Sequence, residues 1–536
     1  MAQVLTNNTG LQYALESSLG VLPGSPDWKV TEPNDIGAFG AEITTVSRNP
    51  ISKLRQRRKG TRVDLDSNAE FEADTTFDSM LDFAAGFMFA NATNADMTFR
   101  AADAQVGPAG FTIPSATAAQ AAKFQYTAAG PISLVHAAGY TTTGNNSPLT
   151  VFEIAADVAA TDTVIEVTGI TTETAPTNAE VSLAGIRAEA GDLDLSISGT
   201  IGTITSGNGA SVTPIDFTTL GLTVGQRIHI GGLTATNRFG STAGGSNDSY
   251  GSARIRTIAA GTLTVDKMDT TLSDSDGTDT GSAGAEVQCD LLFGRFVRNV
   301  SVDHADYNAQ SFQFEGSYPN LYETDPPTPV ANPDGFEYVV GALPNTWSWA
   351  MALTDKSVST FSFIAKGADD LVDNGSRKTN ASTARLPLFT EAINTSIDCF
   401  RLGITDVDET GLTTDFKDIT ALISNNVTPE KVLCVSGARF MNNGNFDLNV
   451  TGEALFTSPL VINRIKNNTT VTMDWLVKND DGACSVDVPS AVIKDGAKTF
   501  PINESVRFAF DVEAFVDSMF LTSIGVSFFP VYPAAA

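Results

Sequence analysis

The sequence predicts a mainly β protein built from several compact units. Two observations indicate this: short apolar segments alternate with polar residues between Gly-rich turns, and Phe (32 residues) far outnumbers Trp (4) and Tyr (9). Charged residues make up only 18% of the chain, which does not suit long, charged helices. Because 536 residues exceed what one hydrophobic core usually covers, we expect two to four domains.

The first predicted unit covers residues 1–100. Two strands or a hairpin are expected over residues 43–65, and an alternating strand continues to Phe71. A helix follows, because Thr75 and Asp78 have the spacing of a capping box. Its apolar face is predicted to carry Phe77, Met80, Leu81, Ala84, Ala85 and Met88.

Residues 101–290 differ in composition from the segments on either side. They are poor in large aromatic side chains and rich in Ala, Gly, Ser and Thr, with strand-like pieces such as Thr163 to Val167 and Thr262 to Val265. We expect one or two small β-modules, inserted between strands of a larger domain. Their polar composition predicts that these modules project outward and that the main body does not need them.

Residues 291–384 are expected to continue the first unit, and residues 385–536 to form a second. Phe312 and Phe314 flank a polar residue, as do Phe510 and Val512, which is the pattern of strands with one wet face.

A weak internal similarity links the two units. The pair Asp64-Leu65 precedes the helix predicted after Thr75, and the pair Asp447-Leu448 precedes a second helix start. There Ser458 can cap the helix and Pro459 occupies its first position. Glu70 and Glu453 fall at the same distance from the two pairs. The chain is therefore expected to hold one strand–helix–strand unit twice.

The overall charge is strongly negative. With 33 Lys and Arg against 62 Asp and Glu, the formal net charge is −29. A protein that grips nucleic acid neutralises phosphates with basic side chains, and this chain as a whole is not suited to that. Such a charge fits a surface that DNA crosses without sticking, and it also fits simple solubility.

One segment is concentrated in positive charge. It contains Arg48, Lys53, Arg55, Arg57, Arg58, Lys59 and Arg62. Three interpretations compete: a DNA contact, a solvated loop, or a contact with the acidic surface of another copy of the chain. We favour the third, since head-to-tail self-association needs two different, complementary surfaces.

The sequence shows no pattern typical of an enzyme, and we expect no catalytic residue, cofactor or metal. The three histidines, His136, His229 and His304, form no ligand motif, and His229 is expected on the wet face of a strand. The four cysteines form no C-x-x-C pair, which favours free thiols. The start of the chain has no secretory pattern, and its apolar runs are too short to span a bilayer.

The N-terminal segment contains a distinctive motif, in which Gly10, Tyr13 and Glu16 are followed by Gly20-Val21-Leu22-Pro23 and then by Trp28. This motif resembles the opening of siphophage tail tube proteins. The strand and helix over residues 62–89 are similar to the same family. So are the later segments Gly294 to Arg298, Phe312 to Phe314 and Phe361 to Gly367.

This resemblance implies a fold, a function and partners. Subunits of such tubes fold as a β-sandwich with a flanking helix, and they form stacked rings whose inner sheets join into one barrel. It implies a conduit for DNA ejection with an acidic lumen, and contacts with tape measure and tail terminator or tip proteins. It places the protein in the virion tail, assembled in the host cytoplasm, with no membrane partner. The length of this chain favours a duplicated tube fold and rings of three chains over six.

Other functions stay open at this point. A capsid decoration protein, a tail fibre or an adhesin is the main alternative, although the chain shows no export signal and no regular fibre repeat. A polysaccharide depolymerase would need a pair of carboxylates in a cleft, which a sequence with this many Asp and Glu does not exclude.

Overall fold

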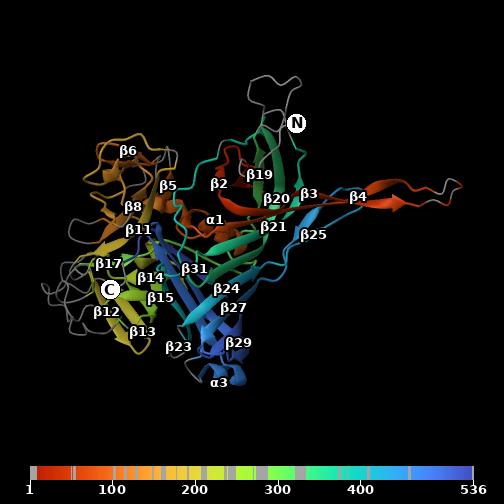
Figure 1. Ribbon diagram of the computed structural model, residues 1–536. Helices are drawn as coiled ribbons and strands as arrows, with labels where there is room; N and C mark the ends of the chain where they lie inside the picture. Colours follow the sequence, from red (N-terminus) through yellow and green to blue (C-terminus); the bar gives the residue numbers. More distant parts are fainter. Residues whose placement is uncertain are drawn as a thin grey trace.

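The chain folds almost entirely into β-sheets (Figure 1). Within the described residues, the strands form one sheet of 16 strands, a second sheet of ten and two small ones. The mainly β class expected from the sequence is thus confirmed. The computed structural model describes residues 6, 9–49, 51, 53, 56–100, 104–113, 117–126, 131–147, 150–158, 164–176, 178–189, 192–206, 214–234, 238–239, 249–269, 271–272, 288–319, 334–371, 376–382, 384–406, 411–413, 415–456 and 460–533.

Seven strands of the large sheet, together with one helix, form a unit that we call the first repeat. In the sheet its strands lie in the order β2-β1-β19-β20-β21-β4-β3. Its elements along the chain are β1 (Gly10–Leu15), β2 (Lys29–Thr31), β3 (Pro33–Arg48), β4 (Arg58–Asp74), α1 (Phe77–Phe87), β19 (Phe312–Tyr318), β20 (Gly335–Ala352) and β21 (Val358–Ala368).

The second repeat has the same arrangement, both along the chain and in the sheet. Its strands lie in the order β23-β22-β28-β29-β30-β27-β24. Its elements are β22 (Cys399–Asp406), β23 (Gly411–Thr413), β24 (Phe416–Ser424), β27 (Asp447–Leu455), α3 (Leu460–Asn467), β28 (Val471–Asn479), β29 (Gly482–Thr499) and β30 (Arg507–Ala514). Each element of one repeat therefore has a counterpart in the other.

β-bulges confirm the equivalence residue by residue, because a bulge marks one position in a strand. The long strand β20 shifts register against β19 beyond Val339, and β29 shifts against β28 beyond Val488. Six residues after each of these positions the same strand shifts again, against β21 in the first repeat and against β30 in the second. Two bulges at matching positions in two strands indicate a duplicated fold.

The two repeats are joined edge to edge. The second half of β20 pairs with β24, so that β3-β4-β21-β20-β24-β27-β30-β29 form an unbroken antiparallel series. We call this series the eight-strand run, and β3 and β29 are its two ends. Two further strands, β18 (Arg295–Arg298) and β31 (Gly525–Phe529), extend the sheet from the first half of β29. A small hairpin of β25 (Thr428–Glu430) and β26 (Phe440–Asn442) lies between β24 and β27.

Helix α1 packs its apolar side into the core of the first repeat. It begins one residue later than expected, because Thr76 is the N-cap residue and its side chain makes no capping bond. The Thr75 hydroxyl instead lies 2.9 Å from that of Ser359 on β21. The deepest side chains are Phe83 and Phe87, which the predicted apolar face left out. A side chain at Gly86 would collide with Phe312, so the helix approaches β19 closely.

The second helix, α3, occupies the equivalent place after β27. Its Ile462 and Ile465 pack against the same hydrophobic core. The predicted cap residues Ser458 and Pro459 lie outside the described residues.

A separate module, formed by residues 97–293, has its own hydrophobic core. We call it the inserted module, because it lies between α1 and β19 in the chain. Its ten-stranded sheet has the order β12-β13-β16-β15-β14-β17-β11-β8-β9, with β5 beside β11, and β6, β7 and β10 form a three-stranded sheet. The elements are η2 (Ala95–Met97), β5 (Thr98–Arg100), β6 (Gln105–Val106), β7 (Gly110–Thr112), α2 (Ala118–Ala121), β8 (Ile132–Ala138), η4 (Thr143–Asn145), β9 (Phe152–Glu153), β10 (Val164–Glu166), β11 (Glu180–Ala188), β12 (Leu193–Ser198), β13 (Ile201–Ser206), η5 (Phe217–Thr219), β14 (Arg227–Ile230), β15 (Gly251–Ala259), β16 (Thr262–Lys267) and β17 (Cys289–Leu292).

The main core takes side chains from both repeats, between Leu11 and Ala90 and between Val297 and Phe528. Both repeats thus share one continuous core, beside that of the inserted module. The four predicted ranges, 1–100, 101–290, 291–384 and 385–536, stay a prediction about independent folding units.

Candidate assembly surfaces

The hairpin of β3 and β4 projects from the body as a long arm (Figure 1). Arg48 on β3 lies opposite Arg58 on β4, so like charges face each other near its tip. Arg55 lies outside the described residues, and the other six predicted contact residues are all exposed. In the described part of the chain, none of these six forms an ion pair with a carboxylate. The arm therefore presents a positive charge that this chain does not neutralise.

The base of the arm is held by the second repeat. Lys431, which follows β25, lies 2.6 Å from both Asp64 and Asp66 on β4. The Lys431 ammonium donates hydrogen bonds to the carboxylates of Asp64 and Asp66, and these bonds raise the pKa of Lys431. Arg62 also reaches the hydroxyl of Ser436 at 3.3 Å. These contacts fix the direction in which the arm leaves the body.

The eight-strand run has one face in the core and one face in solvent. Phe71, Phe361 and Phe510 lie on the core face. Side chains alternate in strands, so their neighbours point the other way. On β4, β27 and β30 the solvent face carries Glu70, Glu72, Glu453, Asp511 and Glu513, all exposed or half-buried. Lys494 lies 3.4 Å from Asp511 and 3.8 Å from Glu513, and Arg507 lies 3.0 Å from Glu453, so these two cations neutralise part of this charge. The solvent face of the eight-strand run is acidic along these strands.

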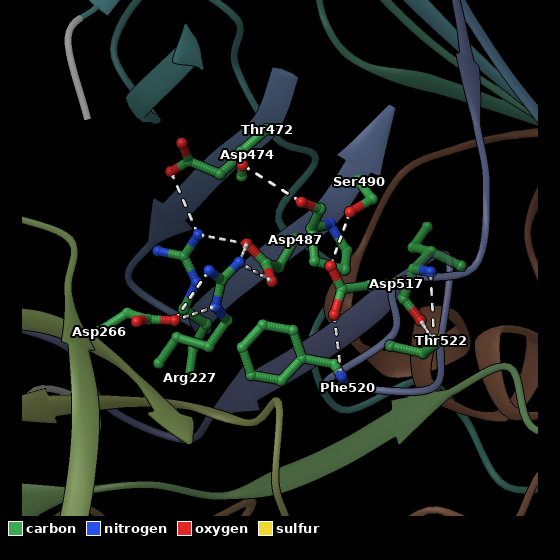
Figure 2. A network of polar contacts seen from close by, with 12 residues as sticks. Arg227, Asp266, Thr472, Asp474, Asp487, Ser490, Asp517, Phe520 and Thr522 are labelled. Atoms are coloured by element: carbon green, nitrogen blue, oxygen red, sulfur yellow. Dashed lines mark hydrogen bonds and ion pairs between the residues drawn. The ribbon is translucent and has the colours of Figure 1, made fainter. Parts of the chain in front are cut away.

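A buried ion network attaches the inserted module to the second repeat (Figure 2). Arg227 on β14 lies 2.6 Å from Asp487 on β29 and 3.6 Å from Asp474 on β28. Arg254 on β15 lies 3.0 Å from the same Asp487 and 2.9 Å from Asp266. The side chains of Arg227, Asp474 and Asp487 are at most 4% exposed. Charged side chains from five strands, β14, β15 and β16 of the inserted module and β28 and β29 of the second repeat, thus meet in a buried site.

The electrostatics of this network favour the ionised state. Burial alone would raise the pKa of Asp487, but the guanidinium groups of Arg254 and Arg227 hold it below its usual range. Arg401 on β22 lies 2.5 Å from Asp474 and so adds a third cation. Removing one partner from such a network leaves an uncompensated charge in a dry site, which is strongly destabilising. The inserted module is therefore attached firmly to the second repeat.

Comparison with known protein families agrees with these features. The model of the family described as phage tail tube protein matches residues 225–512, more than half of the chain. The chain belongs to the phage tail tube protein family. A search among curated proteins gave no match.

As a phage tail tube protein, the chain is a structural component of the virion tail. The matched residues begin just before β14 of the inserted module and end in β30 of the second repeat. The family is a structural, non-enzymatic one, in agreement with the sequence prediction that this is no enzyme. In the described part of the tube protein, no helix is long and apolar enough to cross a membrane.

A polar cavity lined by described residues lies where the inserted module meets α1 and the end of β31. Asp78, Asp82, Arg100, Glu180 and Arg295 line it. Its charges are mostly paired, since Glu180 lies 2.7 Å from Arg100 and 3.1 Å from Arg295, and Asp82 forms an ion pair with Lys29. Among the described residues, no group of three or more His, Cys, Asp or Glu side chains could hold a metal ion.

The structure corrects the sequence reading of His229. This side chain is 5% exposed rather than on a wet face, because the whole of β14 is buried. Its Nδ1 lies 2.8 Å from the carbonyl oxygen of Gly231, and burial lowers its pKa to about 4. The cysteines Cys289, Cys399, Cys434 and Cys484 are free, as predicted.

Proposed function

We propose that this protein polymerises as stacked rings into the tube of a long, non-contractile phage tail, and that the tube is the conduit for DNA ejection. The observation that carries the proposal is the eight-strand run, a sheet with two unpaired ends in a chain of the tail tube family. Long unpaired edges invite pairing with another chain, and closing the sheet into a barrel removes them.

The ring contains three chains in this proposal. Each chain supplies two copies of the tube fold, so three chains form a ring with six equivalent positions. The duplicated order of elements and the matching bulges support this number over six chains. The internal joint between β20 and β24 would then occur three times, alternating with three joints between chains.

The solvent face of the eight-strand run lines the lumen. A face that carries Glu70, Glu72, Glu453 and Asp511 repels the phosphates of passing DNA, which keeps the DNA from sticking. DNA is then a passing cargo with no specific binding site. The helices and the inserted module lie outside the barrel, since α1 and α3 pack on its core face.

The arm formed by β3 and β4 contacts the adjacent ring. Its exposed basic side chains meet the acidic surface of another copy, so stacking is steered by charge and weakens with salt. The ends of the tube meet the tail terminator and tip proteins, and the tape measure protein occupies the lumen before ejection. Assembly takes place in the host cytoplasm.

Electron microscopy of the purified protein tests the proposal. We expect rings or hollow tubes, and native mass spectrometry of single rings should give three chains. Six identical chains per ring would contradict the trimer, and a protein that stays monomeric within virions, located on the capsid or a fibre, would contradict the tube function.

A further inference from the structure

The two ends of the eight-strand run are edges formed by two different strands of the fold, β3 and β29. In the described part of the structure, β3 pairs only with β4, and the second half of β29 pairs only with β30. Their outer backbone groups therefore have no strand partner among the residues that the structure describes. An exposed edge of this length is covered in a stable assembly.

The chain itself contains the joint that such edges make. The second half of β20 pairs antiparallel with β24 between the two repeats. In this joint Met351 lies opposite Ile419, and Trp349 lies opposite Ala421. These side chains point into the core, where Met351 is 7% exposed and Ile419 2%.

The repeats identify the counterparts of these residues. β29 is the counterpart of β20, and its bulge between Ile493 and Asp495 matches the bulge between Pro344 and Thr346. Counted from that bulge, Phe500 corresponds to Met351 and Lys498 to Trp349.

On the other side of the joint, β3 is the counterpart of β24. Asp35 follows a bulge in β3 as Asp418 does in β24, which makes Ile36 the counterpart of Ile419. A second bulge, present in β3 alone, lies between Ile36 and Phe39 and makes Phe39 the counterpart of Ala421.

We propose that β29 of one copy pairs antiparallel with β3 of the next copy, with Phe500 opposite Ile36 and Lys498 opposite Phe39. This inference rests on the proposed ring and gives the residues and register of its joint. The partner is a second copy of this chain. Within one chain β20 pairs with β24, and β29 and β3 are the counterparts of these two strands, so the free edge of β29 fits the free edge of β3. Such a head-to-tail contact closes into a ring when the rotation that relates neighbouring copies is a whole fraction of a full turn.

The exposure of the edge residues supports this joint. Phe500 is 73% exposed in the isolated chain, whereas its counterpart Met351 is almost fully buried. Asp495, Ala497 and Thr499 are exposed, whereas their counterparts Thr346, Ser348 and Ala350 are half-buried. The same strand of the fold is covered in the first repeat and uncovered in the second, so the second repeat lacks a neighbour that the next copy supplies.

Cysteine cross-linking in assembled rings tests the register. The pair Phe500→Cys with Ile36→Cys is placed in a Cys434→Ser background, which removes the exposed native thiol. Rings are first verified under reducing conditions by electron microscopy, then oxidised and separated on a non-reducing gel. The matched control, Thr499→Cys with Ile36→Cys, slips the register by one residue and turns one thiol to the other face. We expect roughly tenfold more chain-to-chain disulfide from the aligned pair than from the slipped pair, because the bond requires Cβ atoms about 3.8 Å apart.

Two further variants keep the outcome decisive. Lys498→Cys with Phe39→Cys is a second aligned pair, used if the first fails to fold. Met351→Cys with Ile419→Cys should form a disulfide within one chain and add no band of higher mass. Rings in which neither aligned pair exceeds the slipped pair would overturn the register and leave the proposed function standing. A wild-type chain that forms no rings would overturn the proposed function, and this joint with it.

Discussion

Arg227 and Asp487 meet across the boundary between the inserted module and the second repeat, with side chains 2.6 Å apart and both almost fully buried. They are 260 residues apart in the chain. This contact makes the attachment of the module depend on a few charges, and it leads to the first prediction.

Replacing Arg227 by Ala should destabilise the protein by about 3–5 kcal/mol, because Asp487 and Asp474 would stay buried with one cation fewer. Urea unfolding measures the loss. Arg58→Ala is the matched control: Arg58 is exposed on the arm, so its replacement should change stability by no more than about 0.5 kcal/mol. Similar losses of unfolding free energy in both variants would show that the buried network contributes no more to stability than an exposed arginine does.

Deleting residues 101–290 should impair folding, although the composition of this region first predicts that it is dispensable. The deletion removes Arg227 and Arg254 and leaves Asp474 and Asp487 without them in the second repeat. Adding Asp474→Asn and Asp487→Asn to the deletion should recover soluble protein, since a neutral amide costs less to bury than a carboxylate. Circular dichroism and gel filtration compare the two deletions. Equal recovery of both would mean that the network is not the reason the module is retained.

Stability should fall as pH decreases from about 6.5 to about 4, in part through two buried histidines. Burial lowers the pKa of His136 and of His229 to about 4, so the folded state keeps them neutral while the unfolded state takes up protons. Each histidine lowers the free energy of unfolding by about 3 kcal/mol over this pH interval.

The variant His229→Asn isolates one of these contributions, because its amide can replace the Nδ1 contact with Gly231 and does not titrate. We expect its unfolding free energy to depend less steeply on pH than that of the wild type between pH 7 and 4. Parallel pH curves for the two proteins would contradict the assignment.

Reversing the charge of the arm should yield rings that do not elongate. The triple variant Arg55→Glu, Arg57→Glu and Arg58→Glu changes attraction to the next ring into repulsion, while the arm lies away from the core. The matched control replaces the same three residues by Lys, which keeps the charge and should keep tube growth. Tube lengths are measured by electron microscopy at low and high salt. Normal tubes from the Glu variant would refute the inter-ring role.

The sequence predicted the parts of this fold that depend on local patterns. Alternation around Phe71 and Phe510 predicted strands with the correct buried side, and helical spacing predicted α1. The wet face expected around Phe312 was wrong, because Gln313 and Glu315 are buried on the other side of β19. The similarity between Asp64-Leu65 and Asp447-Leu448 correctly indicated a duplication, but its register was wrong. The bulges match Glu453 with Glu72 and not with Glu70, so the two Asp-Leu pairs are not equivalent positions of the two repeats.

Long-range partners could not be predicted in the same way. Arg227 and Asp487 look like ordinary polar positions of two strands, and only the folded chain brings them together. His229 was misplaced for the same reason, since β14 is covered on both faces by elements distant in sequence. The basic segment, by contrast, was found from composition alone, because the arm is a local hairpin and its charges need no distant partner.

The joint between β20 and β24 also has a consequence for how a ring forms. Because it lies within one polypeptide, it cannot be lost by dilution, and its two edges meet at the high effective concentration of a tethered pair. In the proposed ring of three chains, every second lateral contact is therefore present as soon as a chain folds. Only the remaining contacts have to be found by diffusion, so a gene that encodes two tube folds in tandem halves the number of encounters that assembly requires.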